Sequence, residues 1–143
     1  MASQSKLDEA YLQICQTWSQ LSQAKRKKVG CIIVKDGSII SDGYNGTPKN
    51  FDNSCEFVSE NQSLITKPEV LHAESNAITK LAKSTQSSNN STMYITINPC
   101  VECAKLIIQS EISRVVYKDF YKNDEGIKLI KKANIEINKY EYK

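Results

Sequence analysis

The sequence predicts a single α/β domain covering residues 1–143, a three-layer α/β/α sandwich around a mixed central sheet. Its 143 residues are enough for one domain with its own hydrophobic core. Hydrophobic residues make up 40% and charged residues 24%, which is typical of globular proteins. In the second half, apolar strands alternate with helical patterns, an order that favours parallel pairing with helices packed on the sheet.

The first half predicts a helix, a hairpin and a long loop. Apolar residues recur at steps of four and three, the period of an amphipathic helix, at Leu7, Tyr11, Ile14, Trp18 and Leu21. Basic residues 25–28 end this pattern, and the apolar runs 29–34 and 38–40 then flank Asp36-Gly37, as in a β-hairpin. Residues 43–67 lack apolar periodicity, which predicts an irregular loop that could include a short helix. Long loops of this kind often carry function.

The second half predicts alternating helices and strands. The expected elements are a helix from Pro68 to Leu81, a strand at 93–97, a helix after Asn98-Pro99, a strand at 114–117, a helix at 125–133 and a strand at 135–137. Residues 84–91 are rich in Ser and Asn and are typical of a linker. A proline at a helix start, as at Pro99, is well placed.

Composition excludes several classes of protein. No apolar run approaches the roughly 20 residues of a membrane-spanning helix, and the amino terminus lacks the apolar region of a secretory signal. We therefore expect a cytosolic protein with no membrane partner. The net charge of +3 is too small to indicate a nucleic-acid partner. Five cysteines without a secretion signal argue against a disulfide framework and favour metal or redox chemistry.

Two short motifs supply candidate metal ligands. The segments His72 to Glu74 and Pro99 to Cys103 each stand at an expected helix start, and His72 is the only histidine. Cys100 and Cys103 share one helix face, where the helix amino terminus favours thiolates. One imidazole and two thiolates leave the fourth position of tetrahedral zinc open for water, as in catalytic sites. Glu74 is placed to accept a proton from such a water.

Each motif alone has another interpretation. A single C-x-x-C also fits a redox pair or two buried side chains, and a lone histidine is often a core residue. Together and in this order, the motifs match the H-x-E and P-C-x-x-C signature of zinc nucleobase deaminases. A redox protein without zinc and a noncatalytic zinc protein that senses nucleotides remain as alternatives.

On these residues the chain resembles the deoxycytidylate deaminases of the cytidine deaminase-like superfamily. The resemblance covers nearly the whole chain and is carried by VGCIIV at 29–34, GYNGTP at 43–48, HAESNAI at 72–78, MYIT at 93–96, PCVECAKLIIQ at 99–109 and VVY at 115–117 leading to Tyr121. The GYNG-x-P motif separates this branch from its relatives. Ser75 stands where the family usually has Leu.

The resemblance implies a cytidine deaminase-like fold and zinc-dependent hydrolysis of dCMP to dUMP and ammonia, a step that feeds thymidylate synthesis. It implies one catalytic Zn²⁺ per subunit on His72, Cys100 and Cys103, and Glu74 as the catalytic proton shuttle. It also implies a homohexamer that dCTP with Mg²⁺ activates and dTTP inhibits. The zinc motif alone does not select the base, so free cytidine and tRNA adenosine remain alternative substrates.

Further residues are candidates for binding nucleotides. The 5′-phosphate of a substrate needs basic or hydroxyl donors, and Lys49, Tyr117, Tyr121 and Lys122 are the candidates, with Tyr121 first. The resemblance adds Asn45 and Ala73 as substrate contacts. It places an allosteric nucleotide on the basic stretch and the GYNG loop, at Arg26, Lys28, Gly43, Tyr44 and Gly46.

Some relatives carry a second, structural zinc. Such a site could here draw only on Cys15, Cys31, Cys55 or carboxylates, and we expect these cysteines to be buried packing residues.

Overall fold

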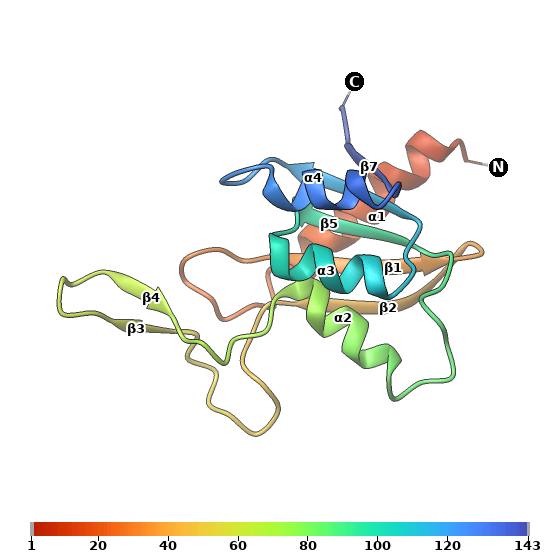
Figure 1. The fold of residues 1–143 in the computed structure, drawn as a ribbon. Coiled ribbons are helices and arrows are strands. Elements are labelled where there is room, and N and C mark those ends of the chain that lie inside the picture. Colours follow the sequence, from red (N-terminus) through yellow and green to blue (C-terminus); the bar gives the residue numbers. More distant parts are fainter. Residues whose placement is uncertain (1, 143) are drawn as a thin grey trace.

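The computed structural model describes residues 2–142, which form three layers (Figure 1). Within them a five-stranded sheet has the order β2-β1-β5-β6-β7. Its strands are β1 (Gly30–Lys35), β2 (Ser38–Tyr44), β5 (Thr92–Ile97), β6 (Arg114–Asp119) and β7 (Glu136–Lys139). Helix α1 (Gln4–Ser19) covers one face, and α2 (Ala73–Leu81), α3 (Val101–Gln109) and α4 (Glu125–Lys132) cover the other. The predicted α/β/α sandwich is confirmed.

The sheet is mixed, as expected. Strand β1 pairs antiparallel with both β2 and β5, whereas β5, β6 and β7 pair in parallel. The β1–β2 hairpin turns at Asp36 and Gly37, with φ of 49° and 77°, and the Asp-Gly pair is suited to such a turn. Helices α3 and α4 provide the crossovers between the parallel strands, so the carboxyl ends of these strands lie at one edge of the sheet.

Successive side chains of each strand point to opposite faces of the sheet, and they form two separate hydrophobic cores. The larger core lies under α2, α3 and α4 and includes Cys31, Ile33, Met93, Ile95, Val115, Tyr117 and Ile137 from the sheet. The smaller core lies under α1 and includes Ile32, Val34, Tyr94 and Val116 from the sheet with Leu12 and Cys15 from the helix. Because successive side chains of a strand point to opposite faces, the residue number decides which core each side chain joins.

The first helix is confirmed, but the apolar stripe that predicted it is not the face that the helix buries. The buried residues of α1 are Asp8, Leu12, Cys15 and Ser19. Leu7 and Ile14 are each 37% exposed. The apolar stripe therefore lies partly on the surface, because a buried aspartate occupies the face that packs on the sheet.

Residues 43–67 also differ from the expected irregular loop. They contain β3 (Glu56–Val58) and β4 (Leu64–Thr66), which pair antiparallel and project away from the sheet (Figure 1). Strands of three residues are too short to show a period in the sequence. The following helix begins at Ala73 rather than Pro68, since Leu71 exchanges both backbone hydrogen bonds with Gly46 and is held extended.

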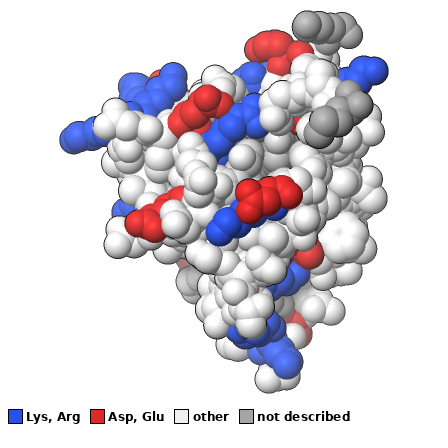
Figure 2. All heavy atoms as spheres, turned by 90° about the vertical axis from the view of Figure 1, so that its right-hand side faces the viewer, with Lys and Arg blue, Asp and Glu red and all other residues white. Residues whose placement is uncertain are grey.

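The surface carries charges of both signs. On the face shown in Figure 2, the lysines and arginines of the described residues are interspersed with aspartates and glutamates. Among residues 2–142, no helix combines the length and the apolar character needed to cross a membrane.

The buried aspartate of α1 joins that helix to the centre of the sheet. Asp8 is 5% exposed and accepts hydrogen bonds from the Tyr94 hydroxyl at 2.5 Å and from Arg114 Nη2 at 2.7 Å. Burial alone raises the pKa of Asp8, but the hydrogen bonds from Arg114 and Tyr94 outweigh it and lower the pKa. Removing one partner of such a buried pair is costly because the other charge is left uncompensated.

We predict that Asp8→Asn lowers the free energy of unfolding by roughly 2–3 kcal/mol at pH 7. A carboxyl whose pKa is lower in the folded state stabilises the fold above its unfolded pKa and loses that effect as the pH falls through the folded value. The difference between the wild type and Asp8→Asn, measured by urea denaturation, should therefore shrink below about pH 4. Asp119→Asn, at an exposed ion pair with Lys118, is the control and should change stability by less than about 1 kcal/mol. Equal effects of the two substitutions would contradict this assignment.

Candidate active site

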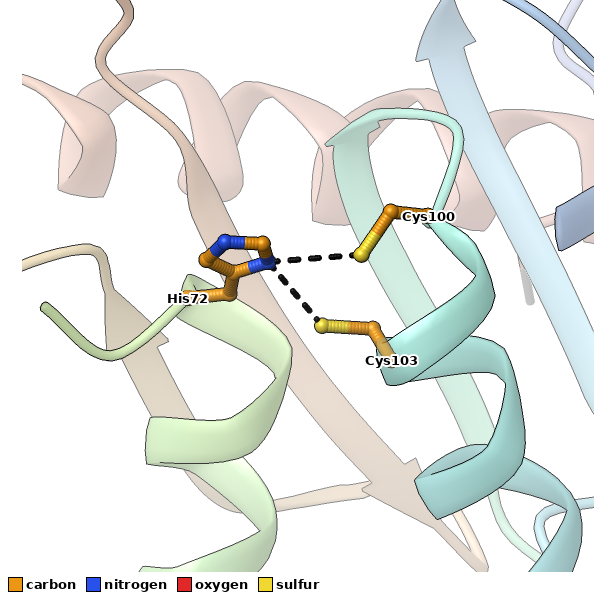
Figure 3. A group of neighbouring side chains, drawn as sticks. All are labelled: His72, Cys100 and Cys103. Carbon is orange, nitrogen blue, oxygen red and sulfur yellow. Dashed lines mark hydrogen bonds between the residues drawn. The ribbon is translucent and has the colours of Figure 1, made fainter. Parts of the chain in front are cut away.

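Two helix starts bring the predicted metal ligands together. His72 is the N-cap residue of α2 and Cys100 is that of α3, and neither makes a side-chain capping hydrogen bond. Cys103 lies in the first turn of α3. Figure 3 shows the imidazole and both thiols pointing toward one another from the two helices. The freed side chains and the positive ends of both helix dipoles therefore face the same point.

The geometry of this triad fits zinc. The Nδ1 atom of His72 lies 3.5 Å from Cys100 Sγ and 3.3 Å from Cys103 Sγ, and the three ligand atoms lie within 4.8 Å of one another. Tetrahedral zinc, with Zn–N and Zn–S bonds of about 2.0 and 2.3 Å, separates neighbouring N and S ligands by about 3.5 Å. Among residues 2–142, this is the one cluster of His, Cys, Asp and Glu with such spacing.

The two thiols of the triad differ in acidity. Hydrogen bonds from Cys103 and His72 lower the pKa of Cys100 to about 3. The Cys100 thiolate and burial together raise the pKa of Cys103. A thiolate is thus available at neutral pH, which is the form that a metal ion requires.

Glu74 is a buried carboxyl beside the triad. It lies in the first turn of α2, is 4% exposed and lines the same cavity as His72 and Cys100. Burial raises the pKa of Glu74 to about 7. A carboxyl with a pKa near the working pH can both accept and donate a proton, which suits general acid–base catalysis.

The triad opens into a cavity of about 300 Å³. Its lining combines Glu74 and two of the ligands, His72 and Cys100, with the basic side chains of residues 26, 27 and 122. His72 and Cys100 are exposed to solvent, so the site has room for water and a substrate. Helix α4 packs closely against the backbone before α3, since a Cβ on Gly126 would lie 2.0 Å from the carbonyl oxygen of Pro99. Only glycine permits this approach.

The predicted substrate residues separate into two groups. Asn45, Ala73 and Tyr121 line the cavity. The amide of Asn45 already accepts the N–H of Val29 at 2.9 Å and donates to the carbonyl of Lys27 at 2.7 Å, so it also holds that loop in place.

Two other candidates for the substrate site are not brought to it. Lys49 is exposed in the loop after β2 and is not among the residues that line the cavity. Tyr117 is 8% exposed and packs in the larger core. Tyr117 is two residues after Val115 on β6, so both side chains lie on the face of the sheet that α2, α3 and α4 cover.

The residues expected to bind an allosteric nucleotide are dispersed. Arg26 lines the cavity, whereas Lys28 is exposed outside it. Gly43 lies against α2, where a Cβ would come within 2.5 Å of the Ala73 carbonyl oxygen. Tyr44 accepts a hydrogen bond from Asn76 through its carbonyl, and Gly46 bridges to the segment before α2. The two glycines thus serve the packing of β2 and its following loop against α2 and the segment before it.

Among the polar residues that line the cavity, the sequence marked Asn98 only by its position after a strand and did not single out Glu56, Thr66 or Asn123. Asn98 follows β5, accepts the N–H of Tyr121 at 2.6 Å and donates to the carbonyls of Tyr121 and Asn123. Its place between a strand end and Pro99 was a usable signal, because strand ends of α/β sheets build sites. Glu56 comes from the β3–β4 hairpin, for which the sequence offered no comparable signal.

The three cysteines outside the triad are buried, and of these Cys55 also lines the cavity. Cys15 and Cys31 are buried in the two cores, and the Cys15 thiol donates to the carbonyl of Tyr94. Cys55 is buried at the base of the hairpin, where its thiol faces the carbonyl of Asn53.

Comparisons with known proteins agree on one family. The model of the cytidine and deoxycytidylate deaminase zinc-binding region matches residues 5–119. A deoxycytidylate deaminase of Enterobacteria phage T4 is 34% identical over 88% of this chain and 86% of its own. One from Mycobacterium phage D29 is 35% identical over 77% of this chain and 92% of its own. The crystal structure of a cyanophage S-TIM5 dCMP deaminase in complex with dCMP and dUMP superposes with a TM-score of 0.89, at 41% identity over 96% of this chain and 99% of that one.

We predict that the wild-type protein binds about one zinc ion per chain and that Cys103→Ser weakens zinc binding at least tenfold, because a hydroxyl is a much poorer ligand than a thiolate. Metal analysis after gel filtration measures this directly. Cys15→Ser is the control, since that thiol lies outside the triad, and it should retain the zinc. Full zinc occupancy in Cys103→Ser would contradict the ligand assignment.

Proposed function

The chain belongs to the cytidine and deoxycytidylate deaminase family, and on this premise we propose that it converts dCMP and water to dUMP and ammonia. One observation carries this proposal: the cluster of His72, Cys100 and Cys103 lies at a cavity that the buried Glu74 also lines. The cyanophage relative, which crystallised with dCMP and dUMP, and the phage deoxycytidylate deaminases support the choice of substrate.

The side chains of this site divide the work. A zinc ion bound by His72, Cys100 and Cys103 would supply Lewis acidity, which lowers the pKa of water. Glu74 takes one proton from the attacking water and delivers it to N3 of the pyrimidine. It then passes the second proton to the amino group, so that the C4–N bond breaks and ammonia leaves while the water oxygen remains on C4. The raised pKa of Glu74 suits both transfers.

The basic part of the cavity is suited to the 5′-phosphate of dCMP. The ammonium groups of Lys27 and Lys122 lie 5.4 and 5.5 Å from the centroid of the Tyr121 ring, and Arg26 lines the same cavity. Charge-assisted hydrogen bonds to phosphate are strong. Asn45 and Ala73 complete the substrate contacts of the proposal.

Assembly and regulation go beyond the catalytic proposal. A homo-oligomer is supported by exposed apolar side chains on α1 and on the hairpin, where Ile14 is 37% and Val58 60% exposed, since such surfaces often mark interfaces. An assembly of six subunits stays a prediction of the resemblance. Activation by dCTP with Mg²⁺, inhibition by dTTP and a cytosolic location likewise stay predictions.

We predict that Glu74→Gln lowers kcat for dCMP by about 10²- to 10⁴-fold, because the amide can neither accept nor deliver the proton. Ammonia release and the change in pyrimidine absorbance measure the rate, and metal analysis should show that zinc is retained. Glu102→Gln is the control, since this exposed carboxyl on α3 pairs with Lys105 on the surface. A Glu74→Gln enzyme with wild-type kcat would overturn the shuttle, and a zinc-loaded wild type inert toward dCMP would overturn the substrate.

A further inference from the structure

Glu56 is a buried acidic side chain that the proposed mechanism does not use. It is 8% exposed, stands on β3 and lines the cavity of the triad. Burying a carboxylate is unfavourable unless its oxygens find partners. Among residues 2–142, Glu56 has no basic side chain within ion-pair distance. Its Oε2 atom instead accepts the backbone N–H groups of Lys25 at 2.8 Å and Arg26 at 3.0 Å.

These two N–H groups belong to a segment that cannot satisfy its own backbone. Residues 22–29 join α1 to β1 without helix or strand, so their backbone groups lack the partners that regular secondary structure provides. Side chains from distant loops supply the partners. Asn45 pairs with the backbone of Lys27 and Val29, and Glu56 accepts the two N–H groups just before them in the chain.

The hairpin holds this segment at a second point. The Nη1 atom of Arg26 donates to Thr66 Oγ1 at 3.2 Å, and Thr66 is the register partner of Glu56 across β3 and β4. The hairpin therefore contacts both the backbone and the side chain of Arg26, and these contacts form a clamp on residues 25–28. Figure 1 shows the orange loop between α1 and β1 on the same side of the sheet as the hairpin.

The clamped segment carries four consecutive basic residues at 25–28. Their mutual repulsion and their flexibility oppose a fixed arrangement, yet Arg26 and Lys27 line the cavity and Lys27 lies over the ring of Tyr121. A carboxylate that accepts backbone hydrogen bonds fixes the loop and also offsets part of this positive charge. The cations are then held in place before an anion arrives, which reduces the entropy lost on binding.

From these contacts we infer that Glu56 is a positioning residue that holds the 25–28 segment as the phosphate-binding wall of the cavity. The inference rests on the proposed function. Glu56 acts through the backbone of Lys25 and Arg26 rather than by touching the phosphate, because two like charges would repel. The wall binds the phosphate group and takes no part in the proton transfers of Glu74.

Steady-state kinetics of the zinc-loaded protein with dCMP test this inference. Glu56→Ala should raise KM for dCMP at least tenfold and change kcat less than about threefold, since only binding loses support. Glu56→Gln keeps an oxygen acceptor for both N–H groups, so its KM should rise by less than about threefold. Glu60→Ala, an exposed carboxylate in the turn of the same hairpin, is the matched control and should behave as wild type.

Inorganic phosphate as a competitive inhibitor gives a second readout. Its inhibition constant should rise in Glu56→Ala by about the same factor as KM. Thr66→Val, which removes the acceptor of Arg26 but suits a strand, should raise both constants to a smaller extent, and it tests the clamp even if Glu56→Ala fails to fold. A loss confined to kcat, an unchanged inhibition constant for phosphate, or equal losses in Glu56→Gln and Glu56→Ala would overturn the inference. Failure of the wild type to deaminate dCMP would instead overturn the proposed function.

Discussion

The active site depends on the close approach of two helix amino termini at one edge of the sheet. Strand β5 ends directly before the Pro99-Cys100 turn, and α2 is held against β2 by the close contact at Gly43. The hydrogen bond from Ser41 Oγ to the Ala77 carbonyl fixes the same packing. Because His72 and Cys100 are the N-cap residues directly before α2 and α3, any displacement of either helix would move a ligand. The geometry of the metal site is thus a property of helix packing on the sheet.

The same arrangement explains why one buried carboxyl lies beside the metal ligands. His72 has the extended backbone of an N-cap residue and Glu74 lies in the first turn of α2, so Glu74 is buried while the imidazole of His72 faces the two thiols. Burial raises its pKa, and the cavity around it continues toward basic side chains from two loops. The candidate ligands and Glu74 thus lie at the starts of helices. The part of the cavity suited to binding a phosphate is formed by loops, and Asn45, Asn98 and Glu56 accept hydrogen bonds from their backbone. This division is common in enzymes, because rigid scaffolds position reactive groups and loops adapt to the substrate.

Local sequence patterns predicted most of the fold and the chemical centre. The H-x-E and C-x-x-C spacings sit at helix starts, so the ligands and Glu74 could be named from local signals alone. What the sequence did not reveal depends on tertiary contacts. The buried face of α1 follows from the pairing of Asp8 with Arg114, which is 106 residues away. Tyr117 lies in the core because of its position along β6. Glu56 reaches the backbone of Lys25 and Arg26 only because the three-residue strands β3 and β4 form a hairpin, which the sequence did not predict.

The central claim is that a His-Cys-Cys zinc site beside Glu74 hydrolyses dCMP. Its most direct test is to add zinc stepwise to the metal-free protein and to follow ammonia release from dCMP. We expect activity to rise in proportion to zinc and to level off at about one equivalent per chain, with dUMP formed in equal amount to ammonia. Activity that is independent of zinc, or a zinc-loaded protein that leaves dCMP unchanged, would contradict this account.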